Sequence, residues 1–401
     1  MATVTLSSPK IAIIGAGPVG CMLARLLHLV DVECTVFEGD DSPNYRSQGG
    51  TQDLHTDTGL AATREAGLDK DFEELARYDG EAMEITDEKC SILMQLEASG
   101  KDKTRLAGSR PEIDRVLLRQ LLGQSLPKGM IRWGHHLKSI AEDGRLILRN
   151  GTESGCFNLI VGAEGTWSKV RKVLSNQTPV YSGLSMYELA IPEPETGTLS
   201  FTSCKWVLVS SMSMPSSRLT RAGWRSSARI RPRWLKSRRY SKNGTFVDCD
   251  GNLKDGLAEC EKYIPRRLHM LPVGFRWKHR RGVTIIGDAA HVMTPFAGEG
   301  VNFGVEDALD LSTAIIAAVE NNSPEVSVAD RLDKAVDKYE IEMGPRVDGY
   351  TRLTNDLMNT WFFSSAPPKR RSSGLWAGTS ALTLHMFCGP SPAWDCKCTM
   401  R

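Results

Sequence analysis

Three glycines near the start of the chain have the spacing of a nucleotide-binding turn. Gly15, Gly17 and Gly20 form the pattern G-x-G-x-x-G between an apolar run at residues 11–14 and an apolar helical pattern. The first glycine permits a tight turn, the second lets a pyrophosphate approach the backbone, and the third lets the helix pack on the strand. The helix N-terminus then offers N–H groups to the phosphates, so these glycines and Ala16 are candidate ligand contacts.

An acidic residue follows at the expected place. Residues 33–38 have the composition of a second strand, and Glu38 closes it, where a carboxylate can bond an adenosine ribose. Strand, glycines, helix and acid agree, which favours a dinucleotide site over a glycine-rich turn that binds nothing.

A second glycine-rich stretch follows a strand predicted at residues 282–287. It places Asp288 at the carboxyl end of that strand, where open α/β sheets bind ligands, although a helix-capping aspartate is the alternative. Gly298, Gly300 and Gly304 lead into a helix predicted to reach about residue 318. Such small residues suggest that a large, flat group lies close to the backbone.

Composition limits the class of protein more than its function. The 401 residues predict two or three domains, and a hydrophobic content of 41% with a net charge of +2 is ordinary for a soluble protein. No apolar stretch approaches a membrane span and no secretory signal is visible, so we expect a cytoplasmic protein without stable membrane insertion. The 10 cysteines are scattered and have no zinc-like spacing, so no metal site is predicted.

Patterning predicts further elements along the chain. We expect an irregular loop at 39–55 and a helix at 58–68. A β-hairpin is expected within 79–105. A helix at 110–122 would have Pro111 in its first turn and Arg115 and Arg119 on a solvated face. Strands at 131–134, 146–149 and 158–161 precede a helix that starts near Ser168.

A basic stretch interrupts the ordinary composition. No Asp or Glu occurs between residues 196 and 247, and residues 200–242 show neither strand alternation nor helical periodicity. Tryptophans interleaved with arginines can bind nucleic acid, but no nucleic-acid-binding motif accompanies them, so we expect no such partner.

Taken together, these motifs resemble the group A flavoprotein monooxygenases, the para-hydroxybenzoate hydroxylase-like family. Residues 15–20 resemble the first flavin motif, residues 287–291 with Pro295 and Gly298 the second, and residues 163–165 with Ser168 and Arg171 the middle motif. Within that family, residues 46–55 and 110–115 are most similar to tetracycline-inactivating monooxygenases and their fungal secondary-metabolism relatives.

The resemblance implies an α/β fold in which a Rossmann-like FAD-binding domain carries an inserted α+β substrate domain with a mixed antiparallel sheet. The FAD-binding domain would comprise residues 1–78, 105–178 and 272–330, and the substrate domain residues 79–104 and 179–271. A helical region at 331–363 and an atypical tail at 364–401 would follow.

The resemblance also implies the ligand contacts. FAD would meet Asp53 and Arg115 in addition to the glycine-rich turn and Glu38, with Asp288 on the ribityl-pyrophosphate region. Arg46 matches a position implicated in NADPH use. The backbone of residues 298–302 (Gly298, Glu299, Gly300, Val301 and Asn302) would border the isoalloxazine, and Pro295 would be a further cofactor contact of the second flavin motif.

The implied activity is transfer of a hydride from NADPH to FAD, followed by insertion of one oxygen atom from O2 into a polycyclic or aromatic natural product. The protein would act as a monomer and would need neither a side-chain nucleophile nor a metal. Two alternatives remain: an FAD-dependent dehydrogenase or oxidase on the same scaffold, or an inactive remnant whose substrate domain is damaged at 200–242.

Overall fold

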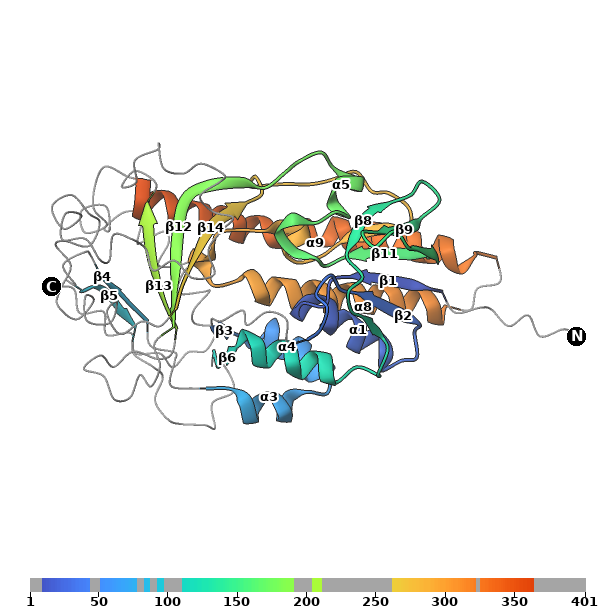
Figure 1. Cartoon of the computed structure of the whole chain (residues 1–401), viewed down its shortest axis with the longest axis horizontal. Coiled ribbons are helices and arrows are strands. Elements are labelled where there is room, and N and C mark those ends of the chain that lie inside the picture. Colours follow the sequence, from blue (N-terminus) through green and yellow to red (C-terminus); the bar gives the residue numbers. More distant parts are fainter. Residues whose placement is uncertain are drawn as a thin grey trace, which may run out of the picture.

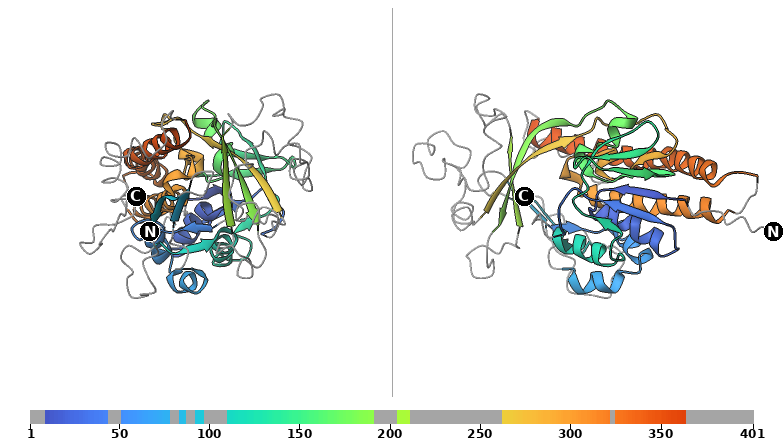
Figure 2. Two further views of the ribbon diagram at one scale, coloured as in Figure 1. Left: turned by 90° about the vertical axis from the view of Figure 1, so that its left-hand side faces the viewer. Right: turned by 45° about the vertical axis from the view of Figure 1, so that its right-hand side comes forward.

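The computed structural model describes residues 9–43, 51–77, 83–86, 92–96, 110–190, 204–210, 262–321 and 325–363 (Figure 1). Its parallel sheet and the antiparallel sheet of residues 180–190, 204–210 and 262–270 lie toward opposite ends of the molecule (Figures 1 and 2). None of the described helices has an apolar stretch long enough to cross a membrane.

The first body is built on a five-stranded parallel sheet with the order β15-β11-β1-β2-β7. Its strands are nearly continuous apolar runs, as expected for a sheet covered on both faces. Their bounds are β1 Ile11–Ile14, β2 Cys34–Phe37, β7 Ile131–Arg132, β11 Leu159–Gly162 and β15 Val283–Ile285.

Helices α1 (Pro18–His28) and α8 (Gly300–Glu320) pack against each other on one face of this sheet (Figure 1). Their close approach depends on two glycines. A Cβ added at Gly304 would lie 2.6 Å from the Val19 side chain, and one added at Gly287 would lie 3.2 Å from it. Val19 therefore packs into space that exists because Gly287 and Gly304 have no side chains.

A three-stranded antiparallel sheet, β10-β9-β8, lies on the other side of the parallel sheet (Figure 1). Smaller elements complete this body: β3 Thr51–Asp53, α2 Gly59–Glu65, α3 Asp69–Leu75, β6 Glu112–Asp114, α4 Arg115–Gln124, β8 Leu137–Ile140, β9 Arg145–Leu148, β10 Glu153–Cys156, η1 Gly165–Trp167, α5 Arg171–Leu174, α7 Asp288–His291 and η6 Pro295–Ala297.

A further antiparallel sheet lies within the segments that the resemblance assigns to a substrate domain, and its role in substrate binding stays a prediction. Strands β12 (Val180–Ala190), β13 (Cys204–Ser210) and β14 (Lys262–Met270) form a sheet with the order β13-β12-β14. Strands β4 (Met83–Thr86) and β5 (Ile92–Leu96) form the expected hairpin. The predicted α/β fold class is confirmed.

Several local predictions were wrong. Residues 110–114 do not begin a helix, because β6 pairs there with β3, and Pro111 and Ile113 are buried on alternate positions while Glu112 and Asp114 are not. That pairing also makes 51–53 a strand within the predicted loop. The helix expected near Ser168 begins at Arg171, and β13 forms a strand within 200–242 although that segment lacks alternation. Residues 211–242 and 364–401 lie outside the described part.

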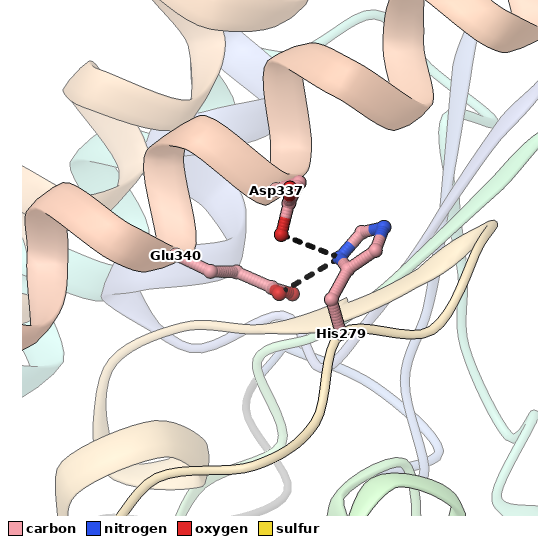
Figure 3. Close-up of side chains that lie close together, drawn as sticks. All are labelled: His279, Asp337 and Glu340. Atoms are coloured by element: carbon pink, nitrogen blue, oxygen red, sulfur yellow. Dashed lines mark hydrogen bonds and ion pairs between the residues drawn. The ribbon is translucent and has the colours of Figure 1, made fainter.

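The long helix α9 (Val328–Met358), continued by the π-helical turn η7 (Asn359–Phe363), packs along α8. His279, just before β15, anchors α9. Its Nδ1 lies 2.9 Å from Glu340 and 3.9 Å from Asp337 (Figure 3). Its Nε2 lies 3.2 Å from Asp333. Glu340 also accepts a hydrogen bond from Thr284, 2.7 Å away.

Atoms of His279, Asp337 and Glu340 lie within 4.8 Å of one another, as metal ligands can. Asp333 and Glu340 already pair with both ring nitrogens, so an imidazolium fits this arrangement without a metal. Burial alone would lower the pKa of His279, but Glu340 and Asp333 raise it. The cluster is an ionic clamp between α9 and the start of β15.

We predict that His279→Gln lowers the free energy of unfolding at pH 6 by ~1 kcal/mol or less, and the melting temperature with it. Both ion pairs are lost, and the His279 side chain is partly exposed. Since the folded pKa is raised, the contribution is present below the ordinary value of 6.5 and disappears as pH rises through the raised pKa. Thermal melts from pH 6 to 9 measure this. Lys338→Gln, which removes an exposed pair on α9, is the control. A pH-independent difference would contradict the clamp.

Candidate functional site

The glycine-rich turn has the geometry of a phosphate-binding turn. Gly15 has φ 107°, which favours glycine, and a Cβ at Gly20 would lie 2.0 Å from the Gly15 carbonyl oxygen. A Cβ at Gly17 would meet nothing within 4 Å. Helix α1 starts there with no side-chain cap and no acidic residue in its first turn. Its N-terminus is therefore open to an anion, although phosphate binding itself stays a prediction.

Glu38 and Arg119 hold this turn from below. Both oxygens of Glu38 accept backbone N–H groups, from Ala16 at 2.7 Å and from Asp40 at 2.9 Å. Arg119 donates to the Ala16 carbonyl oxygen at 3.1 Å and to the Asp40 carboxylate at 3.2 Å. The solvated face predicted for Arg119 was wrong: this side chain joins α4 to the turn.

Asp288 lies at the carboxyl side of β15, as the sequence predicts, and opens α7. Desolvation raises its pKa, while the charges of Arg115, His291 and Arg171 lower it. Arg115 and Asp288, far apart in sequence, are thus electrostatic neighbours. Arg171 is buried and donates to the carbonyl oxygens of Ala289 at 2.8 Å and of Thr166, which fixes the turn that carries Asp288.

The buried carboxylate of Asp307 also stabilises the turn that carries Asp288. Asp307 on α8 is fully buried and accepts from the backbone N–H of Gly287 at 2.8 Å, from His291 Nε2 at 2.6 Å and from Arg346 at 2.6 Å. Burial would lower the pKa of His291, but Asp307 outweighs it and raises the pKa. Asp307 was not singled out from sequence, since it reads as an ordinary helix residue.

The start of α8 forms the other end of the site. Pro295 opens η6, and Gly298 ends it in the left-handed region with φ 69°. A Cβ at Gly300 would meet nothing within 4 Å, and no side chain caps the helix. Asn302 is fully buried: it accepts from the His55 N–H at 2.8 Å and donates to the Asp53 carbonyl oxygen at 3.0 Å. Val301 lies beside it in the first turn.

Next to this turn, His55 lies between Asp53 and Glu299. The sequence analysis gave His55 no role. A usable signal was its position two residues after Asp53, which is itself a predicted FAD contact. Gly304 is the opposite case. It was assigned to a flat ligand, yet its missing side chain accommodates Val19 instead. Arg46 lies outside the described residues, so its proposed contact with NADPH stays a prediction.

The residues present fit FAD in two respects. Gly17 and Gly300 each start a long helix and each leave the space of a side chain open, so two uncapped N-termini can face a ligand. Asp53, bonded through its carbonyl oxygen to Asn302, and Asp288, which follows Gly287 packed against Val19, supply carboxylates near these termini, and Arg115 acts electrostatically on Asp288. A dinucleotide with an anionic pyrophosphate and a flat ring needs this combination.

Comparison with known proteins decides the family. Residues 9–248 and 274–342 match the family described as FAD binding domain. The chain belongs to this family. The match runs through 200–242, where the sequence alone showed no family pattern. It confirms the resemblance to FAD-dependent group A monooxygenases that the motifs predicted.

Individual relatives agree. Monooxygenase penA of Penicillium thymicola is 29% identical over 86% of this chain and 93% of its own length. Monooxygenase asqM of Emericella nidulans is 28% identical over 93% of this chain and 98% of its own length. The crystal structure of tetracycline destructase Tet(51) has the same fold, with a TM-score of 0.66 at 15% identity over 96% of this chain and 100% of that one.

Two glycine variants separate folding from binding. We predict that Gly17→Ala changes the stability of the apoprotein by about 1 kcal/mol or less, because its φ of −76° suits alanine and the space is open. FAD affinity should fall about tenfold or more, as the methyl group occupies the path of the pyrophosphate. Gly20→Ala should destabilise the fold itself by more than ~3 kcal/mol. Thermal melts and FAD titrations measure both; tight FAD binding by Gly17→Ala would rule out this placement.

We also predict that Asp288→Ala weakens FAD binding by about tenfold or more, because the carboxylate after β15 that would accept a hydrogen bond from the ribityl chain is lost. Flavin fluorescence quenching on reconstituted apoprotein measures the dissociation constant. Asp143→Ala, which removes an exposed carboxylate paired with Arg145, is the matched control and should bind FAD normally. Full FAD retention by Asp288→Ala would show that the site lies elsewhere.

Proposed function

We propose that the protein is an NAD(P)H-using monooxygenase that inserts one oxygen atom from O2 into a polycyclic or aromatic natural product, in secondary-metabolite biosynthesis. The observation that carries this proposal is the open N-terminus of α8 at Gly298–Asn302, which is bonded to Asp53. It is supported by the relatives penA and asqM, which are named monooxygenases and match this chain over nearly their whole lengths. We further propose that it acts as a monomer in the cytoplasm.

When bound, FAD would accept the hydride and activate O2. The contribution of the chain is to hold and shield the ring. The N-terminal amides of α8 favour negative charge at this end of the site, because the helix dipole is positive there. Asn302 keeps that first turn in register with β3 through its contacts to His55 and Asp53.

At the other end, Glu38 and Arg119 keep the glycine-rich turn in the shape that a pyrophosphate needs. We assign Asp288 to the ribityl-pyrophosphate region and Arg115, which acts electrostatically on Asp288, to the FAD contacts. We assign substrate binding to the segments 79–104 and 179–271, which include the antiparallel sheet of β12, β13 and β14. Exclusion of water from a substrate held there would suppress side reactions that compete with oxygen transfer.

The first test is purification and turnover. The protein should be yellow with bound FAD, should oxidise NADPH with consumption of O2, and should do so faster with a polycyclic aromatic substrate. Isotopically labelled O2 should put one labelled oxygen atom into the product, measured by mass spectrometry. Oxidised product without label would support a dehydrogenase or oxidase instead. A colourless protein that cannot be reconstituted with FAD would support an inactive remnant.

A further inference from the structure

His55 makes an unusual pair of contacts beside the start of α8. Its Nε2 lies 3.2 Å from the Asp53 carboxylate and its Nδ1 lies 3.2 Å from the Glu299 carboxylate. The side chains of His55 and Glu299 are 13% and 5% exposed, so their contact is buried, whereas the Asp53 side chain is 29% exposed. Asp53 ends β3 and Glu299 precedes the first residue of α8.

Both ring nitrogens of a histidine can donate only when the ring carries its second proton. Because each ring nitrogen of His55 faces one carboxylate, the two contacts together require the imidazolium. Burial would lower the pKa of His55, but the hydrogen bonds to Asp53 and Glu299 raise it from 6.5 to about 9. Burial likewise opposes ionisation of Asp53, yet His55 and Arg110 lower its pKa. The ring is thus charged at neutral pH.

Other charged groups reach this cluster from neighbouring elements. Arg110, ahead of β6, lies 3.6 Å from Asp53. Glu306 on α8 and Tyr350 on α9 act on the far side, next to Glu299. Desolvation raises the pKa of Glu306 to about 7 and also raises that of Tyr350, with Glu299 contributing to each shift. Arg346 on α9 pairs with Glu306 at 3.5 Å, and His55 contacts Glu299 itself at 3.2 Å.

The backbone repeats the same connection. The N–H of His55 donates to Asn302 in the first turn of α8, and Asn302 donates back to the Asp53 carbonyl oxygen. Side-chain and main-chain contacts together join β3 to the residues Gly298–Asn302. Loss of the proton on His55 would leave one carboxylate facing a ring nitrogen without hydrogen, which opens one of these connections.

We propose that His55 is a positioning residue for the flavin: its protonated ring holds β3 against the first turn of α8, and loss of that proton loosens the seat of the isoalloxazine. This rests on the proposed placement of the isoalloxazine at Gly298–Asn302. Because the pKa in the folded protein is above the ordinary value of 6.5, the stabilising effect is complete below 6.5 and is lost as pH rises through about 9.

FAD titrations of the apoprotein between pH 6.5 and 10, followed by flavin fluorescence quenching, test the proposal. The wild-type dissociation constant should increase about tenfold across a midpoint near 9. His55→Gln should bind FAD more weakly at pH 7 and show no such step, and its profile also reports any pH effect of FAD itself. Glu299→Gln should move the midpoint to lower pH, because one of the two carboxylates that raise the pKa is gone.

His279→Gln is the matched control, since His279 also lies between two carboxylates but belongs to the clamp on α9. It should retain the wild-type profile. Circular dichroism at each pH confirms that the variants are folded; if His55→Gln does not fold, the midpoint of Glu299→Gln decides alone. A wild-type profile without a step, or a step unchanged in Glu299→Gln, would overturn the proposal and leave FAD use and oxygenation untouched. Failure to insert labelled oxygen, with the step intact, would overturn the proposed function instead.

Discussion

The fully buried carboxylate of Asp307 is the interaction on which the site depends. It accepts from the Gly287 backbone, His291 and Arg346, and so joins the turn after β15, helix α8 and helix α9 at one point. A buried charge is tolerated only when it is fully paired, and removal of one partner leaves the rest uncompensated. Because Asp307 lies on the same helix whose first turn borders the proposed flavin seat, this network fixes Asp288 and Gly298–Asn302 relative to each other.

Close backbone packing transmits that constraint to the glycine-rich turn. Val19 in the first turn of α1 fits against Gly287 and Gly304, so α1 cannot shift without moving α8. Glu38 and Arg119 then set the turn ahead of α1 from the other side. Two open helix N-termini are held at a fixed spacing in this way, which preorganises the site and reduces the entropy lost when a long, flexible cofactor binds.

Much of this could be predicted from the sequence because it depends on local patterns. The strand, turn and helix around Gly15 to Gly20, the β4–β5 hairpin and helix α8 follow from periodicity and glycine spacing. The pairing of β6 with β3 could not be predicted, since residues 110–114 also suit a helix start and only the distant partner strand decides. Arg119 and Asp307 were missed for the same reason: their partners are remote in sequence. His55 was missed although Asp53 is two residues away, because its second partner, Glu299, is its neighbour only in the fold. Gly304 was misassigned because Val19 is likewise its neighbour only in the fold.

A crystal structure of the protein with FAD tests the central claim most directly. The account predicts the pyrophosphate at the N-terminus of α1 next to Gly17, the ribityl region beside Asp288 and Arg115, and the isoalloxazine against the backbone of Gly298–Asn302. FAD bound with its ring away from the start of α8, or with its pyrophosphate away from the glycine-rich turn, would contradict it.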